Sequence, residues 1–462
     1  IKAHLKYTDE DGGNIEINSK KLNISTNIYT GQNYINVSID KFKDSTKDIN
    51  LSANIILDSK RNKLFLDSKI NVADDISLNF FARSDSKRLD YAIKSNKTIP
   101  STSYLVSILN IDPRVVYWVD TAIKMDGLDI KQAFGFIEYD KMDEALENFY
   151  AYGTANNLEY TYDRKLDSIK TKYTELFFKD GVLFILPNES KTYNFNLDAS
   201  WLRIDFTKPK EILTLHLLFD GIVNKDLKNL LERYKIKLPF IQNSGYMDTN
   251  LILEINLQSL DVDAKGEFYT DNANFNYLGL DLDLKDTLVK LHNFDVRIPK
   301  MSAKYKDIAD ADVNAVLDLK SSQGFIDFDF KKIFFGDALK LNTKENPLNV
   351  KYLISPKQDK IELDSSKWLF NKQNMNIEAI SIPFDLKNLT ADIPTSELSI
   401  NDMLTAYISG KVNLKKLKFD LEADLVKFKY KNIKLAQADA HLKAIYENKK
   451  LTLTSIEPIN LD

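Results

Sequence analysis

The sequence contains no cysteine, only 14 glycines and only four histidines among its 462 residues. Without cysteine, the fold has neither disulfides nor thiolate metal sites. Glycine falls well below its average share of about 7%, so hairpin turns have to be formed by other residues. A cysteine-free chain is compatible with the periplasm but does not require it.

Chemical motifs are also scarce. The histidines His4, His216, His292 and His441 are scattered, without partners at the spacing of a metal site. The sequence has no glycine-rich phosphate loop and no nucleophile elbow. Asp310 and Asp312 could bind calcium, but no glycine-containing loop of the EF-hand type surrounds them. We therefore expect no enzyme activity, no catalytic residue, no cofactor and no metal.

Charge and hydropathy exclude two further classes of partner or anchor within this sequence. The 63 basic and 67 acidic residues are interspersed and give a net charge of -4, so no basic stripe is available for nucleic acid. The longest uncharged run, Thr98 to Ile111, is shorter than the roughly 20 apolar residues of a membrane-spanning helix. Because the chain begins at Ile1 without Met, we expect a cut end, with any signal or anchor outside it.

What the sequence has in abundance is strand pattern. Apolar residues recur at every second position from Ile15 to Leu453, with solvated residues between them. This period of two is typical of a sheet with one apolar and one wet face. The candidate residues lining the apolar face are Ile15, Ile17, Ile24, Leu64, Leu66, Leu78, Phe80, Leu158, Tyr160, Leu213, Leu215, Leu217, Leu251, Leu253, Ile255, Leu257, Leu280, Leu282, Leu284, Phe294, Val296, Ile298, Ile326, Phe328 and Phe330.

Short turns join these strands. Examples are Ser59 to Asn62, Lys179 to Gly181 and Glu447 to Lys450, and such turns connect antiparallel neighbours. The fold class predicted is therefore mainly β: a long antiparallel meander forming a curved sheet, folded lengthwise around an apolar groove. With about 4.8 Å per strand, some 20 to 25 strands would extend over roughly 100 Å.

A few short helices are expected to pack on this sheet. Asp112-Pro113 predicts a helix start, and the helical spacing continues near 113–124 as far as Gly127. A second helix is predicted near 224–234, with Asn224 as its cap. Weaker helical patterns cover 101–109, 140–147 and 401–407.

The periodicity leaves two architectures open. Alternating strands such as Ile326, Phe328 and Phe330 would look the same on the inner face of a closed sandwich. Taken alone, the periodicity favours that sandwich. The length of the meander and the absence of a domain linker favour an open groove. An alternation of Ala, Leu and Tyr traces a weak internal repeat of about 30 residues, as expected for an extended array.

Between about Asp112 and Ile298 the chain resembles the AsmA-like proteins of Gram-negative envelopes, and in particular their YhdP branch. The resemblance lies in the order and spacing of short segments over nearly 190 residues. These are Val116-Tyr117-Trp118-Val119 with Asp126-Gly127-Leu128, then Ala155-Asn156-Asn157-Leu158-Glu159-Tyr160, Leu176 to Ile185, Leu227 to Leu231, Leu238-Pro239 and Ser244-Gly245.

This resemblance implies a function for the apolar face. AsmA-like proteins resemble bridge-like lipid-transfer proteins, are anchored in the inner membrane, and are implicated in moving phospholipids across the periplasm to the outer membrane. The implied partners are phospholipids, the inner membrane through an anchor outside this chain, and an outer-membrane or periplasmic protein. The implied organisation is an N-terminal meander (1–100), a central AsmA-like segment (101–300) and a C-terminal continuation of the groove (301–462). The alternative function is a structural or outer-membrane assembly protein whose β core is closed.

Overall fold

The structure is a computed structural model of the 462-residue chain. It describes residues 2–462 except 9–11, 74, 104–119, 122, 162–167, 193–194, 208–210, 226–227, 230–231, 233–239, 260, 278, 335–339, 343–347, 371–372, 437–438 and 449. The chain forms two compact units: residues 1–219 with 252–263, and residues 220–251 with 264–462.

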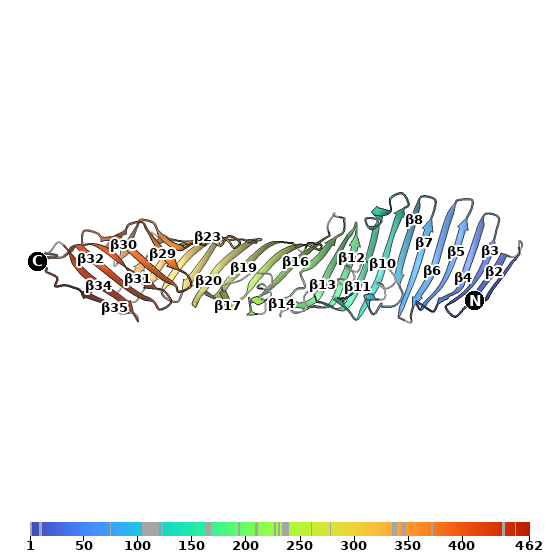
Figure 1. Ribbon diagram of the computed structural model, residues 1–462, viewed down its shortest axis with the longest axis horizontal. Helices are drawn as coiled ribbons and strands as arrows, with labels where there is room; N and C mark the ends of the chain where they lie inside the picture. Colours follow the sequence, from blue (N-terminus) through green and yellow to red (C-terminus); the bar gives the residue numbers. More distant parts are fainter. Residues whose placement is uncertain are drawn as a thin grey trace. The chain divides into compact units, whose positions relative to one another are not determined.

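The fold class predicted from the sequence is confirmed. About 74% of the chain is strand and 3% is helical, and the strands form a long, open, uncrossed antiparallel sheet. Figure 1 shows successive strands lying side by side in chain order within each unit. Most strands pair with the strand that follows the next turn, as the short predicted turns require. Some pairings pass over a strand, as β8 with β10, β13 with β15, β23 with β25 and β26 with β29.

The first unit is a ladder of antiparallel hairpins. Its strands are β1 (Lys2–Thr8), β2 (Gly12–Asn18), β3 (Leu22–Thr30), β4 (Tyr34–Asp44), β5 (Ile49–Asp58), β6 (Lys63–Val72), β7 (Ile76–Ser84), β8 (Arg88–Ser95), β9 (Ile123–Lys124), β10 (Gly127–Glu138), β11 (Phe149–Tyr160), β12 (Ile169–Lys179), β13 (Val182–Thr192), β14 (Phe195–Asn196), β15 (Trp201–Asp205) and most of β16 (Ile212–Gly221).

The second unit continues the same kind of ladder. After β18 (Met247–Asn256) and β19 (Val262–Tyr277), which both units share, and the preceding β17 (Phe240–Gly245), its strands are β20 (Leu280–His292), β21 (Asp295–Tyr305), β22 (Ala309–Asp318), β23 (Gln323–Phe334), β24 (Lys340–Asn342), β25 (Leu348–Ile354), β26 (Asp359–Leu363), β27 (Ser366–Phe370), β28 (Gln373–Ile377), β29 (Ile380–Asp385), β30 (Thr390–Ile400), β31 (Leu404–Asn413), β32 (Lys418–Tyr430), β33 (Ile433–Lys434), β34 (Ala440–Glu447) and β35 (Lys450–Ser455).

The predicted turns are present. Asn62, Asp180 and Asn448 adopt φ angles of 53°, 51° and 53° in the turns after β5, β12 and β34. Asn and Asp tolerate this left-handed conformation better than other residues that carry a Cβ atom. Asn and Asp thus occupy left-handed turn positions that glycine often takes, which explains how a meander can be built with so few glycines.

The helix predictions have mixed outcomes. Most of the helix expected near 113–124 lies outside the described residues, and its last two positions belong to strand β9. Near 224–234 the described residues Lys225, Lys228, Asn229 and Glu232 are helical, and the Lys228 amide donates to the Asn224 carbonyl at 3.0 Å.

Of the weaker helical patterns, the one at 140–147 forms a 3-10 helix, η2 (Met142–Leu146). The one at 401–407 was wrong, because Leu404 begins strand β31 and its neighbour Ala406 lies in the ladder. The pattern at 101–109 lies largely outside the described residues.

Gly245 has a local role in the second unit. Its φ is +89°, and a Cβ atom there would lie 2.4 Å from the Asn272 carbonyl oxygen. Beside it, the buried Gln242 side chain accepts from the Val223 amide at 2.8 Å and donates to the Gly245 carbonyl at 3.1 Å. Glycine thus allows β17 to approach β19 at a bulge between Gln242 and Ser244.

We predict that Gly245→Ala destabilises the second unit by about 3 kcal/mol, combining backbone strain with a steric clash. Gly279 is the matched control, because its φ is +91° but nothing lies within 4 Å of an added Cβ. Gly279→Ala should therefore cost only the strain, about 1 kcal/mol. Urea unfolding followed by circular dichroism measures both; equal costs would show that the clash is absent.

Candidate functional site: an apolar sheet face

Cross-strand pairing defines the apolar face of the first unit. In an antiparallel ladder, directly paired residues project from the same face. One row of direct pairs joins Ile17, Ile24, Phe42, Leu51, Ile70 and Leu78. A second joins Ile15, Thr26, Ile39, Ala53, Ser68, Phe80 and Ile93. We call the side of the sheet that carries these rows the apolar face.

The predicted lining residues of the first unit fall on this face. Leu64 and Leu66 pair with Leu57 and Ile55, which continue the rows on β5. The face passes on through β10 to β16, where pairs include Leu158 with Thr171, Tyr160 with Ile169, Leu213 with Ile204 and Leu215 with Leu202. By strand alternation Leu217 follows Leu215, and in β18 the half-buried Leu251, Leu253 and Ile255 alternate, with Leu257 just beyond its end.

The second unit has an apolar face of its own, built in the same way. Direct pairs join Leu280, Leu282 and Leu284 to Tyr277, Phe275 and Ala273. The face continues through Val296 to Leu317, Ile298 to Ala315, and Ile326, Phe328 and Phe330 to Tyr352, Val350 and Leu348. Phe294 alone among the predicted residues of this unit lies in a turn, between β20 and β21, and is 49% exposed.

The large side chains of the apolar faces are mostly half-buried, whereas small ones fill the buried positions. Ala53, Ser68 and Ala133 are 9%, 4% and 4% exposed in the first unit, and Ala311, Ala315 and Ala406 are 3%, 2% and 2% exposed in the second. These small residues lie between larger apolar residues on adjacent strands, as Ala53 does between Ile39 on β4 and the row that continues through β6. Sequence reasoning missed them because it sought only large apolar residues, although they occupy the same alternating positions.

Exposure changes along the strands of the first unit. At one end, Val72, Ile76 and Ile99 form a buried cluster, with 6%, 1% and 0% exposure, against which Leu78 and Leu128 pack. At the other end of the same strands, Leu57 and Leu64 are 38% and 36% exposed. One edge of this apolar face is therefore sealed by its own side chains and the opposite edge is accessible to solvent.

The reverse side of the sheet, which we call the polar face, is rich in ion pairs. Lys290 lies 2.9 Å from Glu267, Lys351 lies 3.6 Å from Asp327, and Lys443 lies 3.3 Å from Asp420. The acidic residues Asp281, Asp283, Asp310 and Asp312, expected on the solvated face, are on this side by direct pairing. Partly exposed pairs of this kind each add little stability, but they keep this side of the sheet wet.

Aromatic residues interrupt the polar face in the first unit. Phe177 and Phe184 pair directly, and the Tyr152 ring stacks on Phe177 at 4.7 Å. β12 and β13 are therefore apolar on both faces. The helix predicted near 113–124 was among those expected to pack on the sheet. That helix falls largely outside the described residues.

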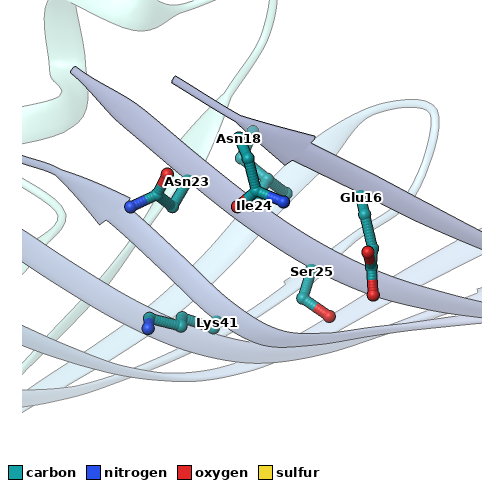
Figure 2. A pocket seen from close by; sticks show the side chains of 6 residues that line it. All are labelled: Glu16, Asn18, Asn23, Ile24, Ser25 and Lys41. Atoms are coloured by element: carbon teal, nitrogen blue, oxygen red, sulfur yellow. The ribbon is translucent and has the colours of Figure 1, made fainter. Parts of the chain in front are cut away.

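A shallow hollow on β2 to β4 is lined by Glu16, Asn18, Asn23, Ile24, Ser25 and Lys41 (Figure 2). Its side chains are mainly polar and include one acid and one base. Glu16, Ser25 and Lys41 form a row of direct pairs on the polar face. Such a row is what a solvated strand face ordinarily carries, and it offers no converging set of catalytic groups.

The described residues contain no cluster of His, Cys, Asp or Glu arranged to hold a metal ion. Within the same part of the chain, no helix is long and apolar enough to cross a membrane. No protein-family model, curated protein or solved structure matches the sequence or fold.

One histidine has a charged partner. His441 Nδ1 lies in hydrogen-bond contact with the Asp424 carboxylate on the polar face of β32 and β34. The hydrogen bond to Asp424 and its negative charge raise the pKa of His441 above its ordinary value. The stabilisation from this pair is therefore complete below the pKa of His441 in the unfolded chain and is lost as the pH rises through its pKa in the folded protein.

We predict that the His441 imidazole titrates above 6.5 in the folded protein and that Asp424→Asn lowers its pKa toward that ordinary value. NMR titration of the histidine ring protons measures both. His4 is exposed on β1 in the first unit, and its ring signal serves as the internal control. An unchanged His441 pKa in the variant would contradict the assigned cause.

Proposed function

We propose that this protein binds the acyl chains of phospholipids on its apolar faces and conducts these lipids across the periplasm between the inner and outer membranes. The observation that carries the proposal is the apolar face of the first unit, whose large residues remain half-buried and reach 36% to 38% exposure at Leu64 and Leu57. In a two-layer sandwich a second sheet would cover such residues. The periplasmic setting and the membrane anchor rest on the resemblance to AsmA-like proteins.

The energetics of lipid transfer support a face of this kind. A two-tailed lipid has about 30 methylenes, so at about 0.8 kcal/mol each its bare transit through water would cost roughly 20 kcal/mol. Contact with a row such as Ile17, Ile24, Phe42, Leu51 and Ile70 replaces water around the chains with hydrocarbon. A strand of ten residues spans about 33 Å, which is long enough to bend around acyl chains.

A structural or outer-membrane assembly protein with a closed β core is the second candidate. It is favoured by one region of the second unit, where Tyr352, Ile382, Phe384 and Leu389 form a buried cluster. On this view the apolar faces would serve only to hold the sheet together. Lipid occupancy separates the two candidates.

We expect phospholipid to co-purify with the protein and to be lost when a charge is placed on the apolar face. Leu253→Asp and Ile55→Asp place a carboxylate among the acyl chains, where an unpaired charge is costly. Ser52→Asp is the matched control, because Ser52 lies in the same strand as Ile55 but on the polar face opposite Lys69. Solvent extraction followed by lipid mass spectrometry measures occupancy, and circular dichroism confirms folding.

Co-purified lipid in the wild type and in Ser52→Asp, but not in the two apolar-face variants, would support the conduit. A lipid-free wild-type protein that unfolds cooperatively would contradict it and favour the closed core.

We further predict weak selectivity among phospholipid headgroups, because the apolar faces contact acyl chains and leave headgroups in solvent. Competition of phosphatidylethanolamine, phosphatidylglycerol and phosphatidylcholine of identical acyl chains against one fluorescent lipid measures this. Affinities within about threefold of one another, a difference of less than 1 kcal/mol, are expected. A preference of a hundredfold for one headgroup would show that a polar site reads it.

A further inference from the structure

The sheet of the second unit has two long sides along which its strands end and turn, and we call these sides its edges. In this unit the two edges meet. The turns at 293–294, 319–322 and 355–358 lie along one edge, because direct pairs place Val296, Leu317, Gly324 and Ile354 in one row beside them. Gly279 lies at the other ends of the strands, in the turn next to the pair of Tyr277 and Leu280. Four ladder steps separate β20 from β25, through β21, β22 and β23.

Despite this separation, Leu280 packs against the buried cluster that contains Tyr352. In a flat sheet four steps alone would separate the strands by about 19 Å, and the two residues also lie toward opposite ends of their strands. The contact therefore requires the sheet of the second unit to curl until one edge touches the other, with the apolar face inside.

A polar contact accompanies this closure. Tyr352 is 6% exposed and its hydroxyl donates to Asp359 Oδ2 at 2.6 Å, while the Ser355 amide donates to Asp359 Oδ1 at 3.0 Å. From the opposite edge, Tyr277 comes near the same carboxylate. Burial and then the charge of Asp359 raise the pKa of Tyr277, and burial followed by the hydrogen bond to Asp359 raises the pKa of Tyr352.

Beneath this contact the apolar face is filled by the protein itself. Ile382, Phe384 and Leu389 are 7%, 8% and 4% exposed, and the Tyr352 and Phe384 rings meet edge to face at 5.5 Å. An acyl chain cannot lie along the face here while these side chains occupy it. This differs from the first unit, where one edge of the apolar face is accessible.

We propose that Tyr277 and Leu280 on one edge, with Tyr352 and Asp359 on the other, form a clasp that closes the apolar face of the second unit and has to open for a lipid to pass. This inference rests on the proposed function. Parting of the two edges would withdraw Leu280 from the cluster and expose the face to acyl chains. The clasp thus controls passage, whereas the accessible edge of the first unit receives lipid.

The absence of cysteine from the chain makes a direct test possible. Tyr277→Cys combined with Asp359→Cys places two thiols across the clasp, and a short bifunctional methanethiosulfonate reagent joins them until dithiothreitol releases it. Ser399→Cys with Thr405→Cys is the matched control, because these residues pair directly between β30 and β31 on the polar face. Donor vesicles of phosphatidylcholine with fluorescent phosphatidylethanolamine, and unlabelled acceptor vesicles, report lipid transfer.

We expect the clasp crosslink to abolish most transfer, dithiothreitol to restore it, and the control crosslink to leave it unchanged. Fluorescent lipid binding by the crosslinked protein should persist, because the first unit is untouched. Undiminished transfer through the crosslinked clasp would overturn the clasp alone. A protein that neither binds nor transfers lipid before crosslinking would overturn the proposed function itself, and the clasp with it.

Discussion

The constraint on which this structure depends is the register between neighbouring strands. Because side chains alternate with a period of two, a slip of one residue in any ladder would turn the apolar residues of that strand to the polar side. The direct pairs from Ile17 to Leu78, and from Ile298 through Ala315 and Ile326 to Tyr352, keep apolar residues on one face within each unit. Individual ion pairs and turns contribute less to the choice of register, since the apolar face already selects it.

Bulges preserve this register where the sequence alternation fails. Ile39 and Phe42 are three positions apart, yet both lie on the apolar face because a bulge between them adds one residue to β4. The same spacing recurs between Ile298 and Met301 in β21 and between Ile393 and Ser396 in β30. Each bulge also bends its strand and increases the local twist, so the bulge in β21 contributes to the curvature that brings Leu280 to the cluster of Tyr352.

The strands, the turns and the side to which Leu64, Leu213 or Phe328 points follow from alternation and turn chemistry, both of which are local in the sequence. The bulges were not predictable in this way, because an extra residue is recognised only against the strand it faces. The buried role of Ala53 and Ala311 was equally hidden, since it depends on large neighbours across the ladder. Contact between the edges was hidden further still: Tyr277 and Asp359 are 82 positions apart, and only accumulated curvature brings them near each other.

Pairing between strands that follow one another in the chain also bears on how such a protein is made. When β6 has left the ribosome, its partner β5 is already complete, and nothing downstream is needed for the two to pair. Each finished hairpin can therefore template the next, and the sheet can grow from the N-terminus at the pace of synthesis. The clasp is an exception, because the cluster against which Leu280 packs is formed by β25, β29 and β30, which are made later. At every stage of this growth the newest strand has one unpaired side. Its free backbone groups can pair with another chain, so this strand is where a growing sheet is most prone to aggregate.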